Sequence, residues 1–159
     1  MSMSSNLPSV VDEEAFAVRR TIRIAASVEK VWRAITDPEH VSRWFGRLSL
    51  DGAGAGATGG IAWPDRDPIP LRVEASEEPR MVSYRWNNDD ALGTPPEEFD
   101  LDRSTVFTFT LEPLADGTQL TVVETGFDRT SDPAGNMRSH GDGWTSELDK
   151  LVALLEGDR

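Results

Sequence analysis

Few residues in this chain have the types and spacing that chemistry requires. The two histidines, His40 and His140, belong to separate segments, and no H-x-x-x-H or H-E-x-x-H spacing is present, so the sequence offers no metal-binding pattern. Cysteine is absent, which excludes thiol catalysis and thiolate ligands. No G-x-S-x-G motif presents a serine for nucleophilic attack. We therefore expect neither a metal nor another cofactor.

One segment matches the consensus of a dinucleotide-binding motif but not the structural context that the motif requires. Residues 54–59 read G-x-G-x-x-G and follow the strand-like segment "RLSL". A phosphate cradle also needs a helix that begins at the glycines, so that its first amides meet the pyrophosphate. The following segment, "GIAWPDRDPIP", contains three prolines and cannot open such a helix. The sequence therefore favours a flexible turn over a phosphate site.

Glu124, Tyr84 and His140 are the candidates for acid–base chemistry. In "GTQLTVVETGF", Glu124 is in phase with alternating apolar residues, so a strand would turn its carboxylate toward the interior. A place near the strand end, in contact with water, is the alternative; burial without a cation would raise the pKa of the carboxyl. His140 lies four residues before Trp144, which puts both on one face of a helix. A cyclase- or hydrolase-type enzyme would use these three groups.

The remaining acidic residues are predicted to face solvent. The carboxylate pairs at 77–78, 89–90 and 97–98 occupy turn-like segments, which favours solvated positions over acid–base roles. The chain has 28 acidic and 16 basic residues, a net charge of −12. Because this charge repels phosphate backbones and anionic lipids, we expect neither a nucleic-acid partner nor insertion into a membrane.

Aromatic residues are the other unusual feature. The chain has five tryptophans and six phenylalanines, and several fall on the inward phase of their segments. Such residues can simply fill a core, but aromatic rings with a few polar groups also form ligand pockets. The residues predicted to line a ligand cavity are Trp44, Phe45, Trp63, Tyr84, Trp86, Phe107, Phe109, Glu124, His140 and Trp144.

Periodicity predicts the elements that must position these residues. "FAVRRTIRIAA" alternates as a strand, and "SVEKVWRAIT" then carries apolar residues at helical spacing behind the N-cap Ser27. Asp37 and Pro38 signal a second short helix over 38–45, which carries the pair Trp44 and Phe45. Further strands are predicted at 47–51, 60–64, 69–76, 80–87, 104–113 and 118–127, with an Asp-Gly hairpin turn before the last and an acidic loop at 88–103.

The C-terminal segment is predicted to be the long helix of the fold. Its apolar residues from Trp144 onward follow helical spacing, and the Asp-Pro signal at 132–133 offers an early start. Because Gly135, Gly141 and Gly143 each cost roughly 1 kcal/mol relative to alanine, we expect a kink or a late start. Only this helix can cover the concave face of a curved antiparallel sheet, so the fold class is α+β, with a sheet wrapped around a helix.

The domain organisation and compartment follow from composition. Residues 1–14 are small, polar or acidic and are predicted to be a disordered tail, and 15–159 a single domain. No apolar run of 18 residues and no signal-peptide pattern occurs, so we expect a cytoplasmic protein. Whether the chain forms a homodimer is left open by the sequence.

Several segments together resemble a known family. "RTIRIAASVEKVWRAITDPEHVSRWFG", "GGIAW", "GTQLTVVETGF" and "GWTSELDKLVALLE" are similar to the activator of Hsp90 ATPase homologue (AHSA1-like) branch of the START-like, or SRPBCC, superfamily. That resemblance implies a helix-grip (START/Bet v 1-like) fold with a cavity between sheet and helix. It places Trp44 and Phe45 at one rim of the cavity, with one ring inward and the other facing the opening. It also matches Gly60, Trp63 and the Gly143–Trp144 pair to family motifs.

The resemblance implies three classes of function. Members of the superfamily bind hydrophobic small molecules, catalyse cyclisations, or stimulate a chaperone ATPase. The chain lacks room for the second domain of the chaperone activator, so a chaperone partner is disfavoured. The sequence thus predicts a protein that binds a small hydrophobic or aromatic ligand in an internal cavity. A cyclase- or hydrolase-type enzyme, or a partner-binding protein that uses Trp44 and Phe45, is the alternative.

Overall fold

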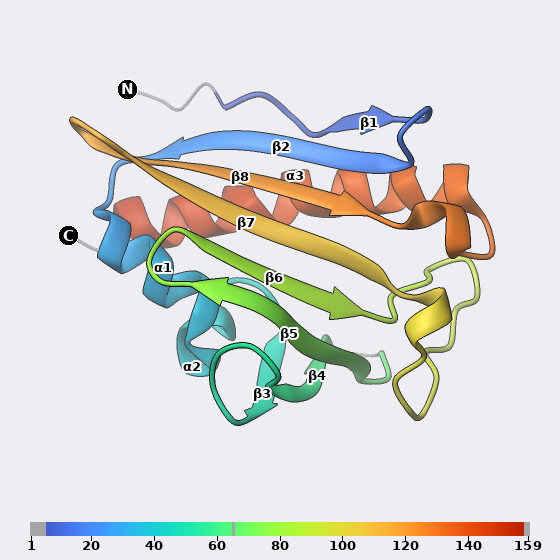
Figure 1. Ribbon diagram of the computed structural model, residues 1–159. Coiled ribbons are helices and arrows are strands. Elements are labelled where there is room, and N and C mark those ends of the chain that lie inside the picture. Colours follow the sequence, from blue (N-terminus) through green and yellow to red (C-terminus); the bar gives the residue numbers. More distant parts are fainter. Residues whose placement is uncertain (1–5, 65, 158–159) are drawn as a thin grey trace.

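Alternating strands connected by short turns build one antiparallel sheet. In the computed structural model, which describes residues 6–64 and 66–157, the described strands follow the order β1-β2-β8-β7-β6-β5-β4-β3 (Figure 1). Strands β3 to β8 are joined in sequence as antiparallel neighbours, and the Asp-Gly turn links β7 to β8 as predicted. The strands are β1 (Val10–Asp12), β2 (Ala17–Ile24), β3 (Arg47–Asp51), β4 (Thr58–Ala62), β5 (Ile69–Glu77), β6 (Met81–Trp86), β7 (Thr105–Leu114) and β8 (Gly117–Thr125).

Two short helices follow β2, as the sequence predicts. Helix α1 (Val28–Thr36) begins where the Ser27 hydroxyl accepts a hydrogen bond from the Lys30 amide at 3.3 Å. Helix α2 (Pro38–Val41) begins with Asp37 as its cap. It ends earlier than the predicted residue 45, because Ser42 turns the chain: its hydroxyl donates to the Pro38 carbonyl and accepts from the Leu48 amide.

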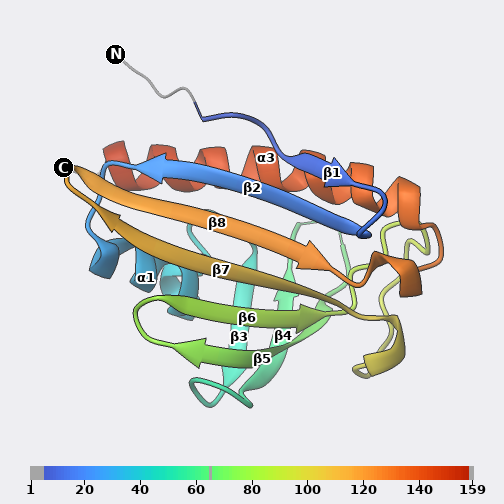
Figure 2. The ribbon, with the colours of Figure 1, turned by 45° about the horizontal axis from the view of Figure 1, so that its top comes forward.

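Helix α3 (Pro133–Gly157) lies along one face of the sheet (Figures 1 and 2). The sequence left two starts open: the early one offered by the Asp-Pro signal is confirmed, and the late one suggested by the glycines is wrong, because the helix begins at Pro133. Packing against the sheet offsets the low helix propensity of the glycines. A Cβ on Gly141 would lie 3.4 Å from Val11 and 3.9 Å from Val18, so this part of the helix packs directly against β1 and β2.

Part of the predicted N-terminal tail, residues 1–14, is paired with the sheet. Val10–Asp12 form β1 against β2, and the Asn6 side chain bonds the backbone of Arg23 in both directions. Residues 1–5 lie outside the described part of the chain. The segment is held by hydrogen bonds that its own composition does not reveal.

Two short 3-10 helices complete the described elements. One, η1 (Leu101–Arg103), precedes β7, and the other, η2 (Phe127–Arg129), follows β8.

The core lies between the sheet and its helices. One cluster of buried apolar residues joins β2 and β4 to β8 with α1, α2 and α3. The α+β helix-grip class predicted from the sequence is therefore confirmed. None of the described helices is long and apolar enough to cross a membrane.

The glycine-rich segment at 54–59 forms the turn after β3, as predicted, and the first two residues of β4. No helix follows it, since β4 begins at Thr58. A Cβ on Gly59 would lie 1.8 Å from the Ser49 carbonyl oxygen. This glycine therefore serves the close approach of two strands rather than a phosphate group.

Candidate functional site

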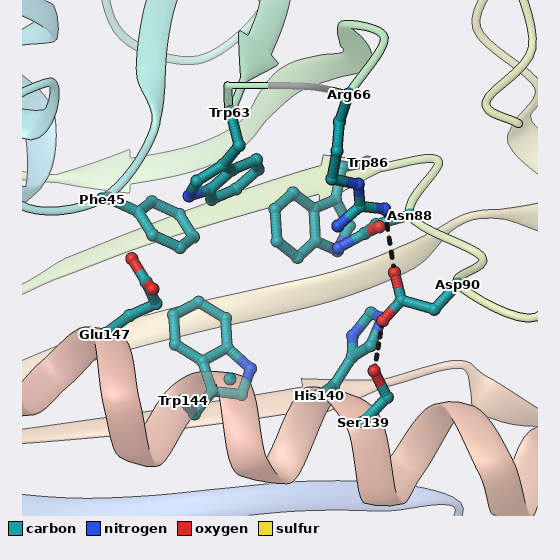
Figure 3. A pocket seen from close by; sticks show the side chains of 11 residues that line it. Phe45, Trp63, Arg66, Trp86, Asn88, Asp90, Ser139, His140, Trp144 and Glu147 are labelled. Atoms are coloured by element: carbon teal, nitrogen blue, oxygen red, sulfur yellow. Dashed lines mark hydrogen bonds and ion pairs between the residues drawn. The ribbon is translucent and has the colours of Figure 1, made fainter. Parts of the chain in front are cut away.

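A pocket of about 290 Å³ opens beside α3 (Figure 3). Four aromatic rings contact one another around it: Phe45 lies 5.1 Å from Trp63 and 5.4 Å from Trp144, and Trp86 lies 6.2 Å from Trp63, between ring centroids. The polar lining comes from α3 and from the segments that follow β4 and β6. It consists of Arg66, Asn88, Asp90, Ser139, His140 and Glu147, with Gly143 between them on the helix.

A fully buried carboxylate organises the wall of this pocket. Glu124, on β8, accepts hydrogen bonds from the indole nitrogens of Trp86 and Trp144, each at 2.9 Å. It also accepts from the Thr105 hydroxyl at 2.5 Å. The Nδ1 of His140 lies 2.9 Å from its Oε1. Three strands and α3 thus meet at one carboxyl group, which fixes two aromatic walls and the imidazole together.

The hydrogen bonds and the electrostatics together favour a buried ion pair at this centre. An indole N–H can only donate, so both oxygens of Glu124 act as acceptors. With Glu124 ionised and His140 protonated on both ring nitrogens, Nδ1 donates to Glu124 and Nε2 faces the Asp90 carboxylate at 3.4 Å. This is the charge state that the pKa shifts of both groups favour.

The pKa shifts of the pair have the same physical origin. Burial alone would raise the pKa of Glu124, but the charge of His140 and hydrogen bonds from His140, Thr105 and Trp86 outweigh burial and lower it. Burial alone would lower the pKa of His140. The charge and hydrogen bond of Glu124, the charge of Asp90 and the backbone of Asn88 outweigh it and raise the pKa. From the sequence we expected a raised pKa for Glu124 only if it were buried without a cation. In the structure His140 supplies that cation, so the pKa is lowered instead.

Asp90 ties the long acidic loop to the mouth of the pocket. Its carboxylate accepts from Arg66 at 3.1 Å and from the Ser139 hydroxyl at 2.5 Å (Figure 3). The neighbouring Asp89 bonds the Ser131 amide and hydroxyl and the Asn136 amide, each at 2.8 Å. These two carboxylates, which were predicted to be solvated, are partly exposed and also bind the first turns of α3.

The predicted cavity residues separate into two groups. Phe45, Trp63, Trp86, His140 and Trp144 line the pocket, and Glu124 lies directly behind three of them. Four others lie in the packed core, where they border a void of about 10 Å³. These are Trp44, Tyr84, Phe107 and Phe109.

The core group includes one of the acid–base candidates. The Tyr84 hydroxyl donates to the Ile35 carbonyl at 2.6 Å, and burial raises the pKa of its phenol. The Trp44 indole donates to the Ala34 carbonyl at 2.7 Å. Both polar tips are therefore committed to the backbone of α1. Trp44 stacks on Phe45 at 5.0 Å, so the pair puts one ring in the core and the other at the pocket.

Five polar lining residues were not predicted from the sequence to belong to the site: Arg66, Asn88, Asp90, Ser139 and Glu147. Ser139 and Glu147 follow the helical spacing of His140, Gly143 and Trp144, and extending that face by one turn each way would have found them. Arg66, Asn88 and Asp90 lie in irregular segments, where spacing gives no signal. Across residues 6–64 and 66–157, no three His, Asp or Glu side chains are arranged to hold a metal ion.

Fold and pocket together define a helix-grip protein with an aromatic site beside its long helix. The family model "Activator of Hsp90 ATPase homolog 1-like protein" matches residues 25–156, and the chain belongs to this family. A search of the curated proteins finds no match.

Solved structures share the fold. Protein MLL2253 from Mesorhizobium loti is 28% identical, with a TM-score of 0.73 over 90% of this chain and 98% of that one. DynU16, described as a putative protein in the dynemicin biosynthetic locus, is also 28% identical, with a TM-score of 0.70; the match covers 88% of this chain and 47% of that one. The Aha1 dimer from Colwellia psychrerythraea is 20% identical, with a TM-score of 0.67 over 88% of this chain and 96% of that one.

Proposed function

We propose that this protein binds a small molecule with a planar aromatic or conjugated ring in the pocket beside α3. The observation that carries the proposal is the ring of contacts among Phe45, Trp63, Trp86 and Trp144 around a pocket of about 290 Å³. Aromatic faces favour flat, polarisable partners by stacking. The volume is at the lower end of the range for ligand pockets, which suits a ligand of about two fused rings.

The walls are held in place before a ligand arrives. Glu124 bonds both Trp86 and Trp144, so neither indole needs to be ordered on binding. Pre-organisation of this kind lowers the entropic cost of association. DynU16, from a biosynthetic locus, has the same fold, and this agrees with a role in small-molecule chemistry.

A cyclase- or hydrolase-type enzyme is the second candidate. The observation that favours it is the Glu124–His140 pair, whose imidazole lines the same pocket. A protonated imidazole held by a carboxylate can act as a general acid. Tyr84 is not part of this candidate, because its hydroxyl is bonded to Ile35 in the core.

The partner-binding hypothesis receives no support from the aromatic pair. Trp44 is 2% exposed, and Phe45 packs against four tryptophans and Phe107. An anchor for a partner needs exposed rings. The likeness to the Aha1 dimer concerns the fold, and a homodimer of this chain is testable by light scattering.

Filling the pocket tests the proposed function. A Cβ on Gly143 would meet nothing within 4 Å, so Gly143→Leu puts a side chain into the pocket from α3. The matched control is Ala153→Leu, at an exposed position of the same helix. We expect naphthalene-type probes to quench tryptophan fluorescence in the parent protein and the control, and to lose affinity at least tenfold in Gly143→Leu. Equal binding to all three proteins, or none to the parent, contradicts the proposal.

A further inference from the structure

Two side-chain atoms of the pocket lining make no hydrogen bond to the described residues: Glu147 Oε1, which is paired with Lys150 Nζ at 3.0 Å, and His140 Nε2. The His140 side chain is 3% exposed, and its Nε2 makes no hydrogen bond to the described residues. Asp90 Oδ2, at 3.4 Å, is farther than the 2.7–3.2 Å of a well-formed N–H···O bond. Burying an unsatisfied donor is unfavourable, so this nitrogen points to an acceptor that arrives with a ligand.

The direction of this donor is fixed by the residues behind it. His140 Nδ1 is engaged by Glu124 at 2.9 Å, which leaves Nε2; this buried atom faces Asp90 Oδ2, so a ligand oxygen reaches it by taking the place of that carboxylate oxygen. The same carboxylate holds Trp86 and Trp144. The donor and two aromatic walls therefore form one rigid unit, and a ligand stacked on the rings meets Nε2 in a set orientation.

We propose that the ligand is a neutral aromatic molecule that carries a carbonyl-type oxygen, and that His140 Nε2 donates a hydrogen bond to this oxygen. The inference rests on the proposed function, which supplies the ring site. It adds the polar group of the ligand, a hydrogen-bond acceptor that is conjugated with the aromatic ring. Aromatic ketones, quinones and amides have this chemistry.

The charges around the pocket favour a neutral acceptor over an anion. Carboxylates stand at opposite ends of the pocket, Asp90 at one and Glu147 at the other (Figure 3). Arg66 is paired with Asp90 at 3.1 Å, so its charge is already compensated. An anionic ligand would be repelled by both carboxylates, within a chain of net charge −12. A cationic ligand would meet the imidazolium and offer it no acceptor.

Four isosteric probes separate these classes: 2-acetylnaphthalene, 2-isopropenylnaphthalene, 2-naphthoate and 2-naphthamidine. They share the ring system and a planar three-atom substituent, and they differ in its charge and acceptors. We expect 2-acetylnaphthalene to bind about tenfold or more tightly than the isopropenyl compound, as a hydrogen bond from a charged donor provides. The carboxylate and the amidinium should both bind less tightly than the ketone.

A variant of His140 isolates the donor. His140→Asn can retain a donor toward Glu124 where Nδ1 stood and removes Nε2. The affinity for the ketone relative to that for the isopropenyl compound should fall until the two affinities are about equal. As a measurement on the unaltered protein, the ketone and not the isopropenyl compound should shift the His140 Nε2 resonance in ¹⁵N-histidine spectra. His40→Gln assigns the two signals.

The outcomes distinguish a failure of the acceptor inference from a failure of the proposed aromatic binding. Equal affinity for the ketone and the isopropenyl compound, with no selective Nε2 shift, overturns the acceptor inference and leaves aromatic binding intact. Tightest binding of 2-naphthoate or 2-naphthamidine replaces the neutral class with an ionic one and also overturns the inference. Failure of all four probes to bind contradicts the proposed function itself.

Discussion

His140 Nδ1 lies 2.9 Å from Glu124 Oε1, and the two side chains are 3% and 0% exposed. This pair joins β8 to α3 across the interior, where charges are costly unless they are paired and hydrogen-bonded. Every other contact of Glu124 is also a hydrogen-bond donor. The pair is therefore both a structural connection and the rear wall of the pocket.

Glu124→Gln should destabilise the fold strongly. The amide nitrogen would face a donor on one side, and His140 would lose its counter-charge. Removing one partner of a buried pair costs about 3–5 kcal/mol, which we expect in urea unfolding. Glu112→Gln, at an exposed site on the adjacent β7, is the control and should change stability by less than about 0.5 kcal/mol. Near-equal stabilities of the two variants would show that the buried pair is dispensable.

Stability should depend on pH through this pair in two windows. The folded-state pKa of Glu124 is lowered from 4.5, so its contribution is present above that value and lost as pH falls through the lowered pKa. The folded-state pKa of His140 is raised from 6.5. Its contribution is therefore complete below 6.5 and is lost as pH rises through the raised pKa. Glu124 and Asp90 face this imidazole, and Arg66 is paired with Asp90 behind it.

Urea unfolding between pH 6 and pH 9 measures the alkaline window. The parent protein should lose stability over this range, and His140→Asn should lose much less of it. A histidine NMR titration should place the midpoint of His140 above that of an ordinary histidine. A midpoint at or below 6.5 would contradict the buried ion pair.

The sequence predicted the framework well, because alternation and helical spacing report burial directly. The strands, the Ser27 and Asp37 caps and the Asp-Gly hairpin depend on neighbours within a few residues. The Asp-Pro signal at 132–133 offered the start at which α3 begins, but the glycines also suggested a late one, since glycine propensity is local and packing against the sheet is not. The paired segment Val10–Asp12 was not predicted, because the residues that hold it and the neighbouring Ser9 are distant in sequence, in β2 and α3.

The candidate site was harder to predict than the fold. The inward phase of Glu124 and the shared face of His140 and Trp144 were visible in the sequence, but their meeting at one carboxylate requires β8 and α3 to pack in a particular register. Arg66 and Asp90 belong to irregular segments, so only the structure brings them together. Inward phase also could not tell pocket from core. Tyr84 and Trp86 lie two residues apart on the inward face of β6, yet only Trp86 lines the pocket.

Gly143→Ala should stabilise the protein. The new methyl group would meet nothing within 4 Å, and removing a glycine from a helix interior gains about 0.5–1 kcal/mol. Gly135→Ala is the matched comparison, because its Cβ would lie 2.3 Å from the Asp132 carboxylate, which accepts from the Gly135 amide. Thermal unfolding should show a rise of a few degrees for Gly143→Ala and a smaller or opposite change for Gly135→Ala. A lower melting temperature for Gly143→Ala would mean that the space beside Gly143 in the pocket is already filled.

Asp89→Ala should loosen the acidic loop without removing a pocket residue. The carboxylate bonds Ser131 and Asn136. Burial alone would raise its pKa, but these hydrogen bonds outweigh burial and lower it. Losing them should cost about 1–2 kcal/mol, as for other helix-capping carboxylates. Hydrogen exchange should quicken in residues 88–100 and in the first turn of α3, because the loop is fastened to the helix there.

Glu98→Ala, at an exposed position of the same loop, is the control and should leave both quantities unchanged. Because Asp90 remains in place in Asp89→Ala, weaker binding of an aromatic probe would show that the anchoring of the loop to α3 also positions Asp90 at the pocket mouth. Unaltered exchange in Asp89→Ala would mean that Asp90 and its bonds to Arg66 and Ser139 hold the loop alone.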